Sequence, residues 1–106
     1  FRERRDIFVD GLNKLPGITC LKPKGAFYVF PNIELTGMTD KEFCDLMLEK
    51  AGVACAPGSI FSENLSNHVR FCYASSKDDI LNALDRMGLV LQQLNINNLK
   101  NGSSFS

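Results

Sequence analysis

Apolar residues recur every three or four positions at both ends of the chain. Near the start, Phe8, Leu12 and Leu15 lie at this spacing among charged residues, a pattern that predicts an amphipathic helix. The Pro-Gly pair at positions 16 and 17 should end it, because proline cannot continue a helix. A longer helix is predicted after Ser76, which is a suitable N-cap. Its apolar stripe is formed by Ile80, Leu84, Met87, Leu91 and Leu94.

A third helix is predicted in the middle of the chain, over the sequence TDKEFCDLMLEKAG. Thr39 and Glu42 have the spacing of a capping box, in which each side chain satisfies a backbone N–H group of the other residue. Gly52 is a plausible C-terminal stop. One apolar face of this helix is provided by Phe43, Leu46 and Met47.

Shorter apolar runs between these helices predict strands. The runs ITCL (18–21) and AFYVF (26–30) are separated by a spacer with Pro23 and Gly25, which favours a turn and antiparallel pairing. Two further strands are expected from VACA (53–56) and VRFCYA (69–74), with a loop between them. The element order therefore predicts an α+β fold, in which a small, mostly antiparallel sheet is packed with helices.

The length of 106 residues suffices for one domain. We place that domain at residues 1–94 and interpret residues 95–106 as a polar tail, rich in Asn and Ser, that should fray. The chain begins at Phe1, directly within a charged helical pattern. We therefore expect it to be a piece of a longer polypeptide.

Charge and hydropathy narrow the possible partners. Twelve basic residues balance twelve acidic ones, and the basic residues are scattered, so nucleic-acid binding is not favoured. No apolar run approaches the ~20 residues that a membrane-spanning helix requires. We therefore expect no membrane association.

The cysteines do not predict a metal site. Cys20, Cys44, Cys55 and Cys72 form no C-x-x-C pair, and the chain has a single histidine. Small buried thiols are typical of a reducing compartment, which favours a cytoplasmic location. The even count leaves two disulfides open as an alternative.

Arg70 is the most informative charged residue, because it lies inside an apolar strand-like run. With a period of two, it shares its face with the small residues Cys72 and Ala74, which leaves room for its side chain. Its stem could cover apolar surface, or its guanidinium could bind a carboxylate through two parallel hydrogen bonds. The residues alone favour the first alternative. His68 precedes this strand and shows no spacing to a nucleophile or acid that would indicate a catalytic triad.

Four segments, in order and in register, resemble a known family. They are FRERRD, LPGITCLKPKGAFYVFPNI, AGVACAPGSIF and VRFCYASSKDDILNALDRM. The chain resembles, from Phe1 to about Leu91, the C-terminal small domain of fold-type I, pyridoxal-phosphate-dependent class I/II aminotransferases, with the bacterial-type aspartate aminotransferase branch closest. Two positions depart from the family pattern: Ser62 stands where a glycine is frequent, and His68 where an aromatic residue is frequent.

The resemblance implies a role for individual residues. By its place in the last motif, Arg70 would bind the α-carboxylate of the substrate. Phe27 would lie near the substrate pocket, although a core aromatic is an equally good interpretation. The cofactor, pyridoxal 5'-phosphate, would be bound by the large domain, since neither Lys24 nor Lys77 falls in a matching motif. No catalytic residue is therefore expected in this chain, which alone should not transaminate.

The resemblance also implies partners for the full-length enzyme. These would be an amino acid and a 2-oxo acid, with aspartate and glutamate as leading substrates, the enzyme's own large domain, and a second subunit in a homodimer. Two alternatives stay open. One is a regulatory or interaction module of the ferredoxin-like type, and the other is a related pyridoxal-phosphate lyase or synthase.

Overall fold

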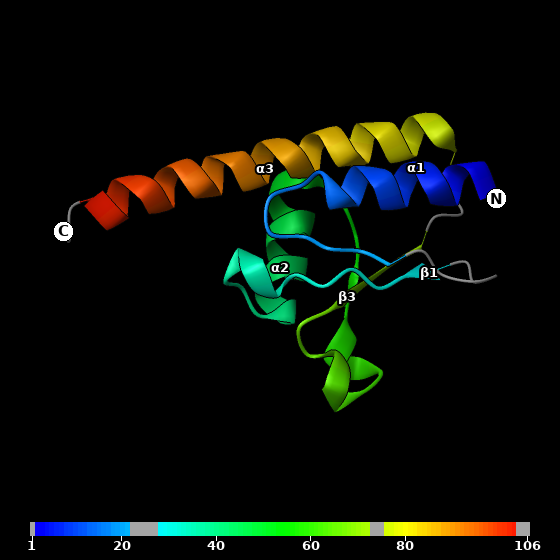
Figure 1. Ribbon diagram of the computed structural model, residues 1–106, viewed down its shortest axis with the longest axis horizontal. Coiled ribbons are helices and arrows are strands. Elements are labelled where there is room, and N and C mark those ends of the chain that lie inside the picture. Colours follow the sequence, from blue (N-terminus) through cyan, green and yellow to red (C-terminus); the bar gives the residue numbers. More distant parts are fainter. Residues whose placement is uncertain (1, 22–27, 73–75, 104–106) are drawn as a thin grey trace.

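The described part of the chain forms three α-helices, short 3-10 and π-helical segments, and a small sheet. The computed structural model describes residues 2–21, 28–72 and 76–103, and the side chains of the last helix as far as Leu94. Helix α1 (Arg2–Asn13) packs along α3 (Lys77–Ser103), and the two lie side by side above the rest of the fold (Figure 1). Helix α2 (Asp40–Leu46) continues into a π-helical segment, Met47–Ala51.

The sheet has three short antiparallel strands in the order β1-β3-β2. They are β1 (Tyr28–Val29), β2 (Ala56–Pro57) and the central β3 (Val69–Cys72). Tyr28 is paired with Cys72, and Ala56 with Arg70. The expected α+β fold, a small antiparallel sheet packed with helices, is thereby confirmed.

Alternation along β3 separates a core face from an outer face. Val69 and Phe71 are buried, Arg70 is partly buried and Cys72 is exposed. The rings of Phe8 on α1 and Phe71 meet edge to face at 5.4 Å between centroids, a favourable arrangement for aromatic pairs. The predicted apolar stripes of the helices lie in the same core, which includes Leu12, Phe43, Met47, Ile80, Leu84, Met87 and Leu91.

The predicted helix termini are present. The backbone N–H of Glu42 donates to Thr39 Oγ1 at 3.1 Å, and Glu42 Oε1 accepts from the Thr39 N–H at 3.0 Å, which completes the capping box. Gly52 follows the π-helical segment with a φ of 67°, a left-handed conformation that favours glycine. Ser76 Oγ accepts from the Asp79 N–H at 3.2 Å and caps α3.

Several boundaries differ from the prediction. The first run, 18–21, forms a single antiparallel bridge between Thr19 and Asn32 instead of a strand, and the turn residues Pro23 and Gly25 lie outside the described residues. The run 53–56 joins the sheet only at its last residue. The expected loop after it contains two 3-10 turns, Gly58–Ile60 and Glu63–Leu65. Short-range backbone bonds can thus stabilise a segment that shows no hydrophobic period.

Helix α3 runs to Ser103, beyond the point at Leu94 where its apolar stripe ends. The division into a domain at residues 1–94 and a polar tail at 95–106 stays a prediction. Once a helix is nucleated, each added residue forms a further backbone hydrogen bond at little cost. Asn and Lys residues disfavour the extension of a helix by only a few tenths of a kcal/mol each. The absence of an apolar period beyond Leu94 therefore did not mark the end of the helix.

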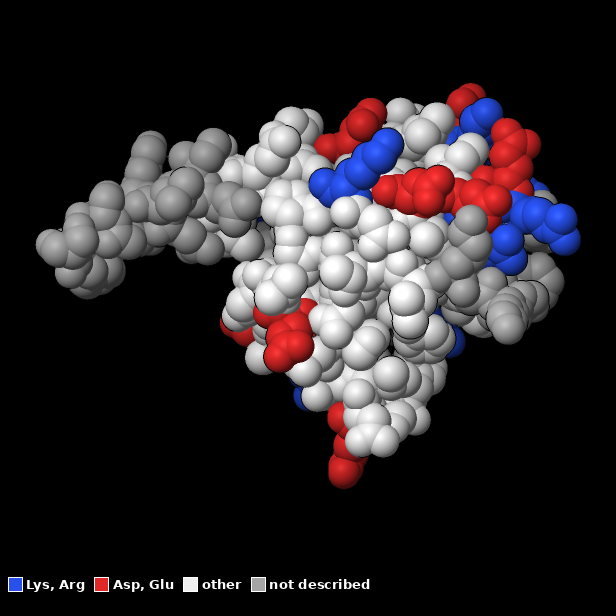
Figure 2. Space-filling view, in the orientation of Figure 1, with Lys and Arg blue, Asp and Glu red and all other residues white. Residues whose placement is uncertain are grey.

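Figure 2 shows how charged side chains are distributed over one face of the protein. Acidic and basic side chains are intermixed over the start of α1 and α3, without a continuous basic stripe on this face. Lys77 and Glu3 form an ion pair there at 3.1 Å. Within the described ranges, no helix has the length and apolar character needed to cross a membrane.

Candidate functional site

Arg70 lies in the middle of the sheet, on the face that points away from the core. Its pairing partner on β2 is Ala56, whose small side chain leaves space above the sheet. The guanidinium carbon Cζ lies 4.3 Å from the centroid of the Tyr28 ring and 4.5 Å from that of Phe61. Phe61 in turn meets Phe30 edge to face at 5.9 Å. Two aromatic rings from separate segments thus hold one guanidinium.

This arrangement leaves the chemically useful part of Arg70 available. A cation–π contact requires no hydrogen bond, and a guanidinium carries five N–H donors in its plane. Among the described residues, no carboxylate forms an ion pair with Arg70. A planar carboxylate that approaches in the guanidinium plane can accept two parallel hydrogen bonds. The site is therefore suited to bind a carboxylate.

The structure describes only some of the other residues around the candidate site. Phe27 lies outside the described residues, so its place near the substrate stays a prediction. Tyr28 and Phe61, which contact Arg70, were missed by the sequence analysis. Tyr28 could have been found, because alternation along β1 places it opposite the buried Val29. Phe61 lies in a turn region and carries no periodic signal.

His68 is partly buried at the entrance to β3, and its Nδ1 atom is buried without a hydrogen-bond partner among the described residues. It borders a cavity of about 380 Å³ together with Asn13, Thr19 and Asn32. No carboxylate among the described residues lines this cavity, so nothing there orients the imidazole as a triad would require.

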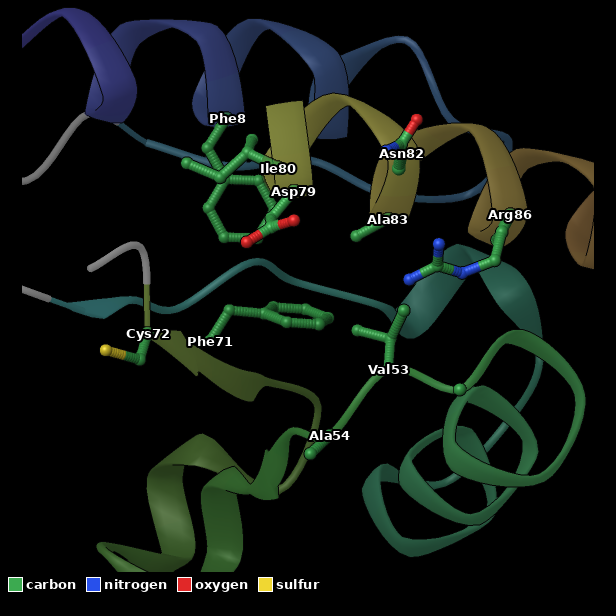
Figure 3. Close-up of a pocket in the computed structure, with 11 residues that line it drawn as sticks. Phe8, Val53, Ala54, Phe71, Cys72, Asp79, Ile80, Asn82, Ala83 and Arg86 are labelled. Atoms are coloured by element: carbon green, nitrogen blue, oxygen red, sulfur yellow. The ribbon is translucent and has the colours of Figure 1, made fainter. Parts of the chain in front are cut away.

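A second cavity lies on the core side of the sheet, away from Arg70. It measures about 430 Å³, and Phe8, Phe71 and Ile80 form its apolar wall, as Figure 3 shows. Arg86 reaches across one side, and its Nε donates to the carbonyl oxygen of Ala51 at 2.7 Å. That bond ties α3 to the end of the π-helical segment. Arg86 is thus engaged in holding the fold, unlike Arg70.

The four cysteines are free thiols. The Sγ atoms of Cys44 and Cys55 lie 3.4 Å apart, beyond the ~2.05 Å of a disulfide bond. Burial raises the pKa of Cys20 to about 11 and also raises the pKa of Cys44 and Cys55. Cys72, expected to be buried, is exposed because it shares the outer face of β3 with Arg70. No group of three or more potential metal ligands is found in the described part of the chain.

These environments predict the order of thiol modification. Iodoacetamide at neutral pH should label Cys72 first, because the thiolate is the reactive form and the other three thiols are buried or partly buried with raised pKa values. Peptide mass spectrometry after short labelling times measures this order. In urea all four cysteines should react alike. Labelling of Cys55 ahead of Cys72 in the folded protein would contradict the described burial.

The described residues do not fit the aldehyde of pyridoxal phosphate. Lys14, Lys41, Lys50 and Lys77 are all exposed, and none of them lines either of the two cavities described above. A lysine that forms a Schiff base is typically desolvated, so that its amine can be neutral. The described part of the chain thus offers a carboxylate site but no lysine site for this cofactor.

Known proteins are similar to this chain over most of its length. The chain matches the family model "Aminotransferase class I and II" over residues 1–87. It is 45% identical over 92 residues to an aspartate aminotransferase of Pyrococcus horikoshii, covering 87% of this chain and 24% of that protein. It is 41% identical over 93 residues to aromatic-amino-acid aminotransferase 2 of Thermococcus litoralis, covering 88% of this chain and 24% of that protein.

A solved structure shows the same fold. The crystal structure of an aromatic aminotransferase from Pyrococcus horikoshii superimposes with a TM-score of 0.83 at 42% identity, covering 87% of this chain and 24% of that one. The chain thus spans about a quarter of the length of the relatives it matches. On the family match and these similarities, the chain belongs to the class I and II aminotransferase family.

Proposed function

We propose that this chain is the small domain of a pyridoxal-phosphate-dependent aminotransferase and that Arg70 anchors the α-carboxylate of its substrates. The observation that carries the proposal is the guanidinium of Arg70, held by Tyr28 and Phe61 and without a carboxylate partner among the described residues. An amino acid and a 2-oxo acid share a carboxylate next to the reacting carbon. One arginine can therefore hold both substrates in turn.

The anchor would act by orientation as well as by affinity. Two parallel hydrogen bonds fix the direction of a carboxylate, whereas a single bond leaves it free to rotate. Holding the substrate in a reactive geometry removes part of the entropic barrier of the reaction. Arg70 would supply this at the carboxylate end, and the exposed rings of Tyr28 and Phe61 would limit how the substrate enters.

The remaining parts of the proposal concern the full-length enzyme. The large domain would hold the cofactor, since the described residues provide no suitable lysine. Aspartate and glutamate are the leading substrates, in keeping with relatives named aspartate aminotransferase, although another relative is named for aromatic amino acids. A homodimer and a cytoplasmic location complete the proposal, as the family resemblance implies.

A direct assay of the full-length protein tests this function. Incubated with pyridoxal phosphate, aspartate and 2-oxoglutarate, it should form glutamate and oxaloacetate in equal amounts, measured by NMR. Residues 1–106 alone should form neither product. The ferredoxin-like alternative predicts instead that residues 1–106 bind a metabolite without the rest of the chain. Absence of amino transfer by the full-length protein from any amino acid tested would refute the proposal.

A further inference from the structure

Asp40 is the one charged side chain, in the described part of the protein, that is almost completely buried, with 6% of its surface exposed. It begins helix α2, and its Oδ1 accepts from the Lys41 N–H at 2.9 Å. Its Oδ2 accepts from the backbone N–H of Ser59 at 3.0 Å. Ser59 is nineteen positions further along the chain. The carboxylate therefore joins α2 to the turn that follows β2.

Hydrogen bonding keeps this carboxylate ionised. The pKa of Asp40 is lowered, above all by hydrogen bonding from Ser59 and against the opposing effect of burial. A lowered pKa means that the contact is fully present at neutral pH and is lost only as the pH falls through the acid range. Charge-assisted bonds to backbone N–H groups are stronger than neutral ones. The attachment of the turn to α2 is thus firm under ordinary conditions.

The same turn carries Phe61 to Arg70. Gly58 donates its N–H to the carbonyl oxygen of His68 at 2.8 Å, which fixes the start of the turn to β3. Ser59 is fixed by Asp40, and the N–H of Phe61 donates back to the Gly58 carbonyl oxygen at 2.9 Å. The ring of Phe61 then lies 4.5 Å from Arg70 Cζ. Two attachment points, one on β3 and one on α2, therefore set the position of this ring.

We propose that Asp40 is a positioning residue for the substrate anchor: through Ser59 it holds the turn that keeps Phe61 against the guanidinium of Arg70. The inference rests on the proposed function, because it assigns Asp40 a role in carboxylate binding. With the Asp40 carboxylate removed, Phe61 can move away, and the guanidinium then samples orientations that do not match the substrate carboxylate. Substrate affinity should fall, although no atom of Asp40 contacts the substrate.

The central test compares Asp40→Ala with Thr39→Ala in the full-length holoenzyme. Both substitutions remove a hydrogen-bonding side chain at the start of α2, but Thr39 makes its bonds with Glu42 and none with the turn. Asp40→Ala should raise KM for the amino acid and for the 2-oxo acid about tenfold and change kcat less, as expected for lost binding. Thr39→Ala should leave both constants within about twofold. Asp40→Asn keeps one carbonyl acceptor and should recover part of the loss.

A double-mutant cycle separates positioning from general stability. Because Asp40 acts through Arg70, Asp40→Ala should raise KM by less than twofold when Arg70 is already lysine. The proposal would be overturned if Asp40→Ala and Arg70→Lys raised KM additively. It would also be overturned if Asp40→Ala and Thr39→Ala raised KM equally. A normal KM and kcat in Arg70→Lys alone would refute the proposed function instead.

Hydrogen exchange tests, without an activity assay, whether Asp40 holds the turn at Ser59. In hydrogen exchange followed by mass spectrometry, Asp40→Ala should speed exchange of the peptide that contains Ser59 at least tenfold, whereas Thr39→Ala should not. If Asp40→Ala fails to fold, Phe61→Leu takes its place in the kinetic test, because it removes the ring and leaves the turn attached. Unchanged exchange at Ser59, or a normal KM in Phe61→Leu, would contradict the inference.

Discussion

Replacing Arg70 with lysine in the full-length enzyme should lower kcat/KM by about two powers of ten or more. The charge is retained in this variant, so the expected loss comes from geometry. Lysine presents a point charge on a flexible stem and cannot form the two parallel bonds of a guanidinium. It also loses the flat stacking surface that Tyr28 and Phe61 contact in the structure. Steady-state kinetics with both substrates measures the effect.

Arg86→Lys is a matched control for this substitution. Arg86 lies on the core side of the sheet, where its Nε donates to Ala51. Its replacement changes the same chemical group away from the candidate site, and kcat/KM should stay within about threefold. Equal losses of kcat/KM in Arg70→Lys and Arg86→Lys would indicate a general effect on folding. Near-normal kinetics of Arg70→Lys would remove Arg70 from the role of anchor.

Gly58→Ala should destabilise the protein by about 1–3 kcal/mol, the usual range for forcing extra volume into a packed site. A Cβ atom at Gly58 would clash with the carbonyl oxygen of Leu65 and lie 2.6 Å from that of His68. Both are backbone atoms, which cannot turn away as the end of a side chain can. The turn would have to shift, and with it the residues that hold Phe61. The urea midpoint of unfolding measures the loss.

The same substitution at Gly88 provides the comparison. Gly88 lies within α3, and a Cβ atom there would meet only a side-chain methyl of Leu15, at 3.4 Å. Alanine is favoured over glycine inside helices by up to about 1 kcal/mol. Gly88→Ala should therefore leave the midpoint unchanged or raise it. A lower midpoint for Gly88→Ala than for Gly58→Ala would contradict the described packing.

The parts of the fold that follow local rules could be predicted from the sequence. The capping box of Thr39 and Glu42 and the stop at Gly52 depend on a few neighbouring residues. Alternation also predicted that Arg70 and Cys72 share one face of their strand, opposite Val69 and Phe71. Strand lengths were less predictable, because a residue joins a sheet only if a partner strand lies beside it. A single bridge at Thr19 therefore replaced the expected run 18–21, and the run 53–56 joins the sheet only at Ala56.

The candidate site was predictable only in its central residue. Arg70 was noticed as a charged residue in an apolar run, and the family resemblance implied that it binds the α-carboxylate of the substrate. The contacts that surround it depend on long-range packing: Phe61 reaches Arg70 through a turn that Asp40 holds from another helix. Asp40 itself has the sequence pattern of an ordinary first-turn acidic residue, which gives no sign of its bond to Ser59.

The most direct test of the central claim is a binding measurement on the full-length protein. The dissociation constants of glutarate and of its neutral diamide, glutaramide, are compared in the natural protein and in Arg70→Lys. If Arg70 binds a substrate carboxylate, glutarate should bind at least tenfold more weakly to the variant, and glutaramide should bind equally to both proteins. Glutarate binding that is unchanged in Arg70→Lys would contradict the assignment of Arg70 as the carboxylate anchor.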